Sequence, residues 1–162
     1  MIIMRDIRRK EKAITDRAEI KSILLKSKYV TLAMCYDNSP YLVTLSHGFD
    51  PEENICYFHC ASKGKKIDYL KNTDEIWGQA FIDKGYAKGE CNHHYASVHF
   101  QGEVKFVTDV REKRKALTIM IDQLEEDPEL RQEVKKKQLL ETALKRVTIG
   151  KILIREMSGK KG

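Results

Sequence analysis

The sequence predicts a mainly β domain, a small antiparallel barrel of six strands with helices at its periphery. Its 162 residues, 41% of them hydrophobic, fit one domain with one sizeable core better than two compact domains. Most apolar runs are short, rich in β-branched and aromatic residues, and separated by turn signals. These runs follow one another directly instead of alternating with long helices, which disfavours a doubly wound parallel sheet.

The first part of the chain is typical of a helix followed by a three-stranded meander. Asp16, with Glu19 three residues later, is a helix N-cap signal and predicts a helix over about 16–27. Turn residues at 37–40 and 50–54 separate the apolar runs that follow. The predicted strands are 29–36, 41–49 and 55–61.

The second part contains the longer elements. Gly64 precedes a short helix, and Asp109 and Asp127 each cap a further helix, the second with Pro128 in its first turn. The remaining expected elements are strands at 76–82, 96–107 and 147–157, a polar loop at 84–94, and a flexible tail at 158–162.

The net charge of +6 is concentrated at the two ends of the chain. Residues 1–14 form a basic arm, and residues 147–162 also carry more basic than acidic side chains. Lysine and arginine are not interleaved with aromatic residues along any one element, so nucleic acid is the least favoured partner.

Targeting signals are not evident in the sequence. No apolar stretch approaches the roughly 20 residues of a membrane helix, and 1–4 is too short for the apolar part of a signal peptide. We therefore expect a cytoplasmic protein whose four cysteines are reduced.

The best local signal for chemistry is the stretch from Ser62 to Lys66. Backbone N–H groups at a helix start attract anions, and Gly64 lets a ligand approach the backbone. Lys65 and Lys66 supply charge and Ser62 a hydroxyl donor, which suits a terminal phosphate. The spacing is not that of a Walker loop, so a solvated lysine-rich turn is the alternative.

Cysteine and histidine residues do not define a metal site. Cys56 and Cys60 share one face of a predicted strand and lie about 13 Å apart at ~3.3 Å per residue, too far to grip one ion. Cys91, His93 and His94 could supply ligands from one loop, and the sequence assigns them no role. No nucleophile–base–carboxylate set is defined by spacing, so a hydrolase is disfavoured.

Five stretches of the chain carry a family resemblance. They are 8–14, 40–50 (PYLVTLSHGFD), 57–68 (YFHCA followed by GKKID), 95–102 (YASV followed by Gly) and 154–160 (IREMSGK). In this order they resemble the FMN-binding split β-barrel proteins related to pyridoxamine 5′-phosphate oxidase, and most closely the nitroimidazole-resistance (Nim-type) branch.

The resemblance implies a six-stranded split barrel that holds FMN across a homodimer. It implies that the isoalloxazine ring lies along Val43, Thr44, Leu45 and Ser46, and that Ser62, Lys65 and Lys66 hold the phosphate. His59 would stand near the flavin as a candidate catalytic or ligand-orienting residue, and Ser97 would contribute from the partner chain. This sequence departs from the family where Thr44 replaces a usual proline and Ser46-His47 replaces asparagine plus an aromatic residue.

The expected function is that of an FMN-dependent oxidoreductase acting on a small acceptor such as a nitro compound or a quinone. Two alternatives remain: a haem- or flavin-binding module of the same barrel without turnover, and a basic regulator that contacts nucleic acid. The strand residues Val43, Leu45, Val98 and Phe100 have no partner helix in the pattern. We expect a second copy of the chain to cover them, since twofold dimers are the commonest oligomers.

Overall fold

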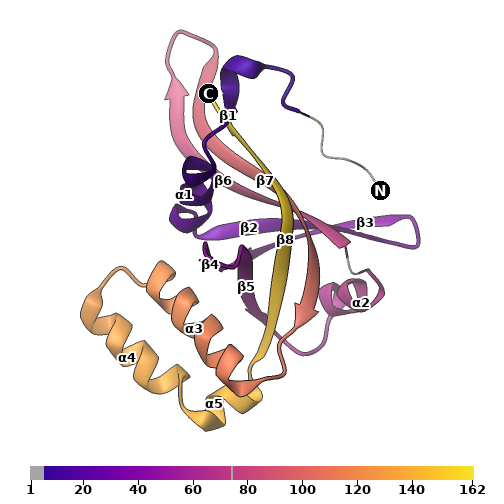
Figure 1. Cartoon of the computed structure of the whole chain (residues 1–162), viewed down its shortest axis with the longest axis vertical. Coiled ribbons are helices and arrows are strands. Elements are labelled where there is room, and N and C mark those ends of the chain that lie inside the picture. Colours follow the sequence, from indigo (N-terminus) through magenta and orange to yellow (C-terminus); the bar gives the residue numbers. More distant parts are fainter. Residues whose placement is uncertain (1–5, 74) are drawn as a thin grey trace.

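The computed structural model describes residues 6–73 and 75–162, and its centre is one antiparallel sheet (Figure 1). Its strands are β1 (Ala13–Ile14), β2 (Tyr29–Tyr36), β3 (Ser39–Ser46), β4 (Gly48–Asp50), β5 (Ile55–Cys60), β6 (Glu75–Ala87), β7 (Asn92–Phe106) and β8 (Thr148–Lys161). Neighbouring strands follow the order β3-β2-β6-β7-β8-β5-β4, and β1 pairs with β8 beside this path.

The two ends of this path meet in space because they are consecutive in the chain. β3 and β4 are joined through His47 alone, so the sheet must curl until its edges approach each other. β3 comes close to β5, yet no backbone ladder joins these two strands in the described residues. We call this opening between β3 and β5 the split; it makes the fold a split barrel.

Helices pack around the barrel, four of them where the sequence predicts a helix. They are α1 (Arg17–Lys26), α2 (Lys65–Asn72), α3 (Val110–Leu124), α4 (Pro128–Gln138) and α5 (Glu141–Arg146). The three predicted N-caps are confirmed: the carboxylates of Asp16, Asp109 and Asp127 each accept a hydrogen bond from a backbone N–H in the first turn that follows. None of the helices in residues 6–73 and 75–162 is long and apolar enough to cross a membrane.

Apolar side chains form two clusters on opposite sides of β5. The inner cluster fills the curled sheet and includes the fully buried Leu32, Phe58 and Phe100. The outer cluster lies between β5, β8 and the helices α3 and α5, and includes Tyr57 and Leu144. Successive side chains of β5 alternate between the two clusters, as a strand requires.

The mainly β class is confirmed, but the described residues form eight strands where six were expected. The run 41–49 is not one strand, because the chain bends at His47 and Gly48 continues as β4. The other addition is β1, whose short pairing with β8 involves the basic arm. Residues 1–5 of that arm lie outside the described residues.

Two expected irregular segments are largely paired, and one helix was not expected. β6 and β7 extend into the polar stretch 84–94, where Tyr86 pairs with His93 and Ala87 with Asn92. Residues 158–161, expected as a flexible tail, continue β8 and pair with β7, for example Lys160 with Ser97. The short α5 has too few residues to show a helical period in the sequence.

Candidate functional site

β3 carries four of the predicted cofactor-binding residues and is an edge of the sheet, next to the split. Val43 and Leu45 are half-buried and pack against the inner cluster. Thr44 points to the other face, where its hydroxyl lies 2.9 Å from that of Thr31 on β2. Ser46 is half-buried at the end of the strand. β3 therefore offers the split a partly apolar wall and one free backbone edge.

The predicted phosphate-binding turn leads into α2. Gly64 is the N-cap with φ +120°, a conformation that L side chains rarely adopt, and no described side chain caps the helix there. Ser62 and Lys65 are exposed, and Lys66 is half-buried. The start of α2 thus combines free N–H groups with two lysines, the arrangement that attracts anions.

Contacts between α2 and β3 bring this turn to the split. The Tyr69 hydroxyl on α2 donates to Ser39 Oγ at 3.1 Å, and the Tyr69 ring lies 5.0 Å from the Tyr41 ring on β3. Lys65 Nζ lies 4.7 Å from the centre of the Tyr41 ring. Lys66 lies near Cys60 at the end of β5, where it opposes the burial that raises the pKa of that thiol.

His59 lies on the opposite side of β5 from the inner cluster. It is exposed and lines a cavity of about 340 Å³ against α3 and α4. On the other face of β5, Phe58 and Cys60, the two neighbours of His59 in the strand, belong to or pack against the inner cluster. The other lining residues are Leu117, Met120, Ile121, Leu124, Glu125, Val134, Gln138 and Val147. This is a mainly apolar cavity with His59 among its few polar groups.

The cavity wall depends on close packing of α3 against β4. A Cβ added at Gly48 would lie 2.7 Å from the backbone N and Cα of Met120, which only glycine avoids. Beside it, the buried His47 places Nε2 3.0 Å from the carbonyl oxygen of Leu24. Burial lowers the pKa of His47, although hydrogen bonding with the backbone opposes this effect. His47 therefore favours the neutral form and holds the bend between β3 and β4.

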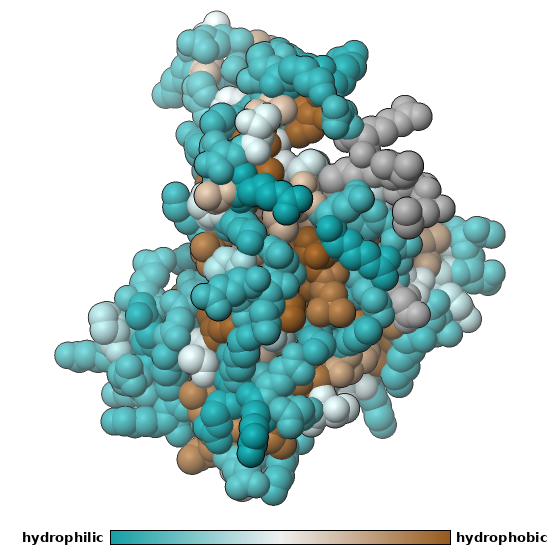
Figure 2. Space-filling view, in the orientation of Figure 1, coloured by the Kyte–Doolittle hydropathy of each residue, from teal (hydrophilic) through white to brown (hydrophobic). Residues whose placement is uncertain are grey.

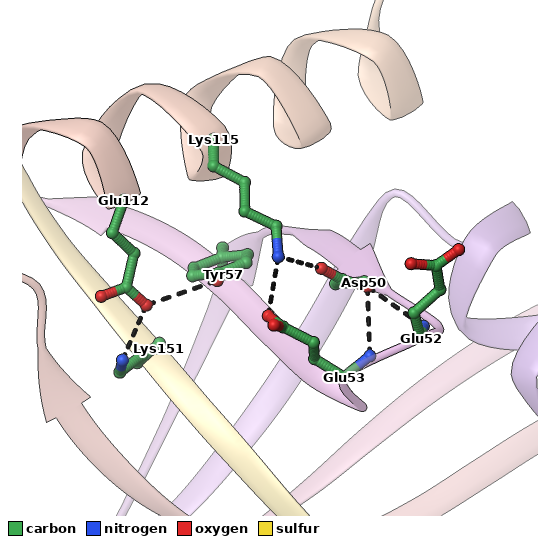
Figure 3. Close-up of polar contacts among 7 residues, drawn as sticks. All are labelled: Asp50, Glu52, Glu53, Tyr57, Glu112, Lys115 and Lys151. Carbon is green, nitrogen blue, oxygen red and sulfur yellow. Dashed lines mark hydrogen bonds and ion pairs between the residues drawn. The ribbon is translucent and has the colours of Figure 1, made fainter.

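An ion-pair network, shown in Figure 3, fixes α3 to the β4–β5 hairpin. The Lys115 ammonium reaches from α3 between Asp50 and Glu53, at 2.7 Å from each carboxylate. Burial acts to raise the pKa of Asp50, but hydrogen bonds from Lys115 and from the N–H groups of Glu53 and Glu52 hold it below its ordinary value.

A second part of the network involves Glu112 of α3. Lys151 on β8 lies 2.6 Å from Glu112, and the Tyr57 hydroxyl donates to the same carboxylate at 3.5 Å. Burial raises the pKa of Tyr57 to about 12, so the phenol keeps its proton. No sequence motif marks this network, because its residues come from α3, the β4–β5 hairpin and β8, which are far apart along the chain.

Ser97 is not near the other predicted residues within one chain. It lies on β7, which is separated from β3 by β2 and β6. Its side chain is 3% exposed and its hydroxyl donates to the carbonyl oxygen of Lys160 at 3.5 Å. The predicted residues of β3 and α2 therefore lie together, whereas His59 faces the cavity against α3 and Ser97 belongs to the outer face of the sheet.

This outer face, and not the predicted one, is without cover in the described chain. Val98 and Phe100 are fully buried in the inner cluster, and Val43 and Leu45 pack against it, because the curled sheet covers its own inner face. On the outer side, Leu42 is 65% exposed. It lines a shallow depression of about 230 Å³ with Thr31, Ala33, Trp77, Gly78, Gln79 and His99.

The view in Figure 2 shows apolar atoms at the surface beside the middle of β8, between largely hydrophilic helices.

The cysteine- and histidine-containing stretch at 91–94 lies elsewhere, at the tip of the β6–β7 hairpin. There His93 Nε2 contacts Asp83 Oδ1 at 2.9 Å, and Cys91 is exposed. The structure places neither residue near the split.

Comparison with known proteins gives a family match and a set of related folds. The family model described as pyridoxamine 5′-phosphate oxidase matches residues 16–160. No curated protein matches the chain.

Three solved structures illustrate the likeness of fold. A protein from Bacteroides thetaiotaomicron with a proposed role in 5-nitroimidazole antibiotic resistance is 23% identical, with a TM-score of 0.77 over 92% of this chain and 86% of the other. The flavocytochrome Anf3 from Azotobacter vinelandii is 17% identical, with a TM-score of 0.77 over 97% and 72%. An FAD- and haem-binding protein from Mycobacterium smegmatis is 14% identical, with a TM-score of 0.71 over 93% and 73%.

Proposed function

Since this chain belongs to the pyridoxamine 5′-phosphate oxidase family, we propose that it is a flavoprotein that binds FMN in the split. One observation carries this proposal: the lysine-bearing start of α2 lies against β3, the edge strand beside the split. A flavin mononucleotide needs both features, a cationic site for its phosphate and a flat, partly apolar wall for its ring.

The chemistry of the described residues fits such a ligand. A phosphate dianion suits the uncapped N–H groups of α2, the ammonium groups of Lys65 and Lys66, and the Ser62 hydroxyl. A Cβ at Gly64 would meet nothing within 4 Å, so this approach is open. The ring would lie along Val43–Ser46, where the free edge of β3 offers backbone donors and acceptors.

When bound, FMN would supply hydride and electron transfer, while the protein supplies orientation and electrostatics. His59 is placed to hydrogen-bond a small molecule at the mouth of the 340 Å³ cavity, and the apolar side chains behind it would exclude water. These properties favour a small aromatic acceptor, such as a nitro compound or a quinone. The Nim-type branch and a cytoplasmic location, in keeping with four unpaired cysteines, belong to the same proposal.

A haem- or FAD-binding module without turnover is the second candidate. It is favoured by the flavocytochrome and the FAD- and haem-binding protein among the related folds. The absorbance spectrum of the purified protein separates the two, because a flavin and a haem absorb at different wavelengths. A haem band without flavin would contradict the FMN proposal.

We also propose a homodimer in which a second copy covers the outer face of β2, β3, β6 and β7. Apolar residues left exposed on a sheet face mark an interaction surface, and the exposed Leu42 and Phe81 lie on these strands. Ser97 is on the same face, so a twofold partner would bring it toward the other chain's β3.

Lysine substitutions test the FMN site. Lys65→Ala or Lys66→Ala should weaken FMN binding about tenfold to a hundredfold, because charge-assisted hydrogen bonds contribute roughly 1.5–3 kcal/mol each. Riboflavin, which has no phosphate, should bind as before. The matched control is Lys71→Ala at the exposed end of the same helix, which should change neither affinity. Flavin fluorescence measures both affinities. An equal loss of affinity for FMN and for riboflavin would contradict the phosphate assignment.

A further inference from the structure

We propose that Tyr41 and Tyr69 form an aromatic platform that holds Lys65 in place for a phosphomonoester, and so make the site selective for phosphorylated ligands. This inference rests on the proposed function and assigns positioning residues to the same site.

The platform is defined by three close contacts. Lys65 Nζ lies 4.7 Å from the centre of the Tyr41 ring and 5.8 Å from that of Tyr69, both within the range of a cation–π interaction. The two rings lie 5.0 Å apart and are inclined by 43°, so both contact the lysine from the same side. The helix alone would not produce this arrangement, because Tyr41 comes from β3.

The rings themselves are held by their surroundings. Tyr69 is 9% exposed, belongs to the inner cluster, and donates a hydrogen bond from its hydroxyl to Ser39 Oγ. Tyr41 is half-buried and packs against the same cluster. The platform is therefore fixed before any ligand arrives.

The Lys65 ammonium keeps its charge available. In residues 6–73 and 75–162, no carboxylate forms an ion pair with it, whereas most lysines of the sheet and of α3 are paired. A ring contact occupies one side of the ammonium and leaves N–H donors on the other. Restricting a long side chain in advance reduces the conformational entropy lost on binding. The gain applies only to a ligand that uses Lys65, namely one with a phosphate.

Affinity titrations with two ligands test the platform. Tyr41→Leu, which keeps an apolar side chain but removes the ring, should weaken FMN twofold to fivefold and leave riboflavin unchanged. Tyr41→Phe keeps the ring and should behave as the wild type. Tyr36→Leu is the matched control, because Tyr36 contacts the Tyr69 ring edge-on but is not among the rings near Lys65.

A double-mutant cycle and NMR complete the test. In a Lys65→Ala background, Tyr41→Leu should have no further effect on FMN. In the ligand-free protein, ring currents should shift the Lys65 methylene protons upfield, and Tyr41→Leu should reduce this shift, since only the more distant Tyr69 ring remains.

The two proposals fail in different ways. If Lys65→Ala weakens FMN but Tyr41→Leu does not, or if Tyr41→Leu weakens both ligands equally, the platform is refuted and the phosphate site stands. If Lys65→Ala leaves FMN binding unchanged, the phosphate site at α2 is itself refuted.

Discussion

At the scale of single residues, His47 decides how the chain bends between the two edges of the sheet. It is fully buried, and its Nε2 donates to the Leu24 carbonyl at the end of α1. The sequence showed only a departure from the family pattern at this position. The structure places the His47 side chain fully buried at this bend, against the end of α1.

His47 predicts a pH dependence of stability. Burial lowers its pKa below 6.5, so below that pH the unfolded chain binds a proton that the folded chain resists. The free energy of unfolding should therefore fall as the pH drops from 6.5, by at most ~1.4 kcal/mol per pH unit. Urea unfolding at several pH values measures it, and His47→Gln should flatten the slope. If the slope of the unfolding free energy against pH is unchanged in His47→Gln, the pH dependence does not come from His47. His99 would then be its source, because burial and the charge of Lys160 also lower the pKa of His99.

At the scale of elements, the main question is what holds α3 against the β4–β5 hairpin and so forms the cavity wall. Leu117 and Met120 of α3 pack with Ile55 and Tyr57 of β5 in the outer cluster. At the edge of this apolar contact, Lys115 forms an ion pair with Asp50, whose side chain is only 8% exposed. Removing the lysine would leave that carboxylate without its cation, beside Glu53.

We predict that Lys115→Met lowers the free energy of unfolding by about 1–2 kcal/mol. This is less than the 3–5 kcal/mol of a fully buried pair, because the Lys115 side chain is 44% exposed. Lys28→Met is the matched control: it breaks an equally short pair with Glu126 whose side chains are 53% and 78% exposed. It should cost less than Lys115→Met, because a solvent-exposed ion pair contributes little to stability. Equal losses in the two variants, measured by thermal unfolding, would show that the Asp50 bridge does not stabilise the fold.

The same network predicts acid sensitivity. Because the pKa of Asp50 lies below its ordinary 3.8 in the folded chain, its contribution is present above that pH and is lost as the pH falls further. Lys115→Met should remove this part of the acid dependence.

At the scale of the whole molecule, the uncovered outer face predicts a homodimer, and we expect dimer formation to be coupled to FMN binding. Leu42→Glu places a charge on that face and should produce a monomer with weakened FMN binding. Leu130→Glu, at a 50% exposed position on α4, is the matched control and should remain dimeric. If FMN binds only the dimer, the apo-protein should dissociate at a higher concentration than the holo-protein.

Sedimentation of both forms over a dilution series measures this linkage. A monomer that keeps stoichiometric FMN at every concentration would contradict a shared site, and with it any role of Ser97.

Features that depend only on neighbours along the chain could be predicted from the sequence. Asp16, Asp109 and Asp127 mark helix starts because a cap needs only the next few backbone N–H groups, and the glycine-lysine turn at α2 is visible for the same reason. Alternation along a strand likewise shows which side chains share a face. Family membership could also be inferred, because it rests on motifs in order.

Which face of the sheet is covered, and which groups far apart in sequence come into contact, became clear only from the folded chain. Alternation cannot tell that the sheet curls over Val98 and Phe100 and leaves Leu42 uncovered, since that depends on the path of all the strands. The side of β5 that His59 takes, and the meeting of Tyr41 with Lys65, follow from packing between elements far apart in sequence. Such contacts depend on how the whole core packs, and therefore no local sequence pattern predicts them.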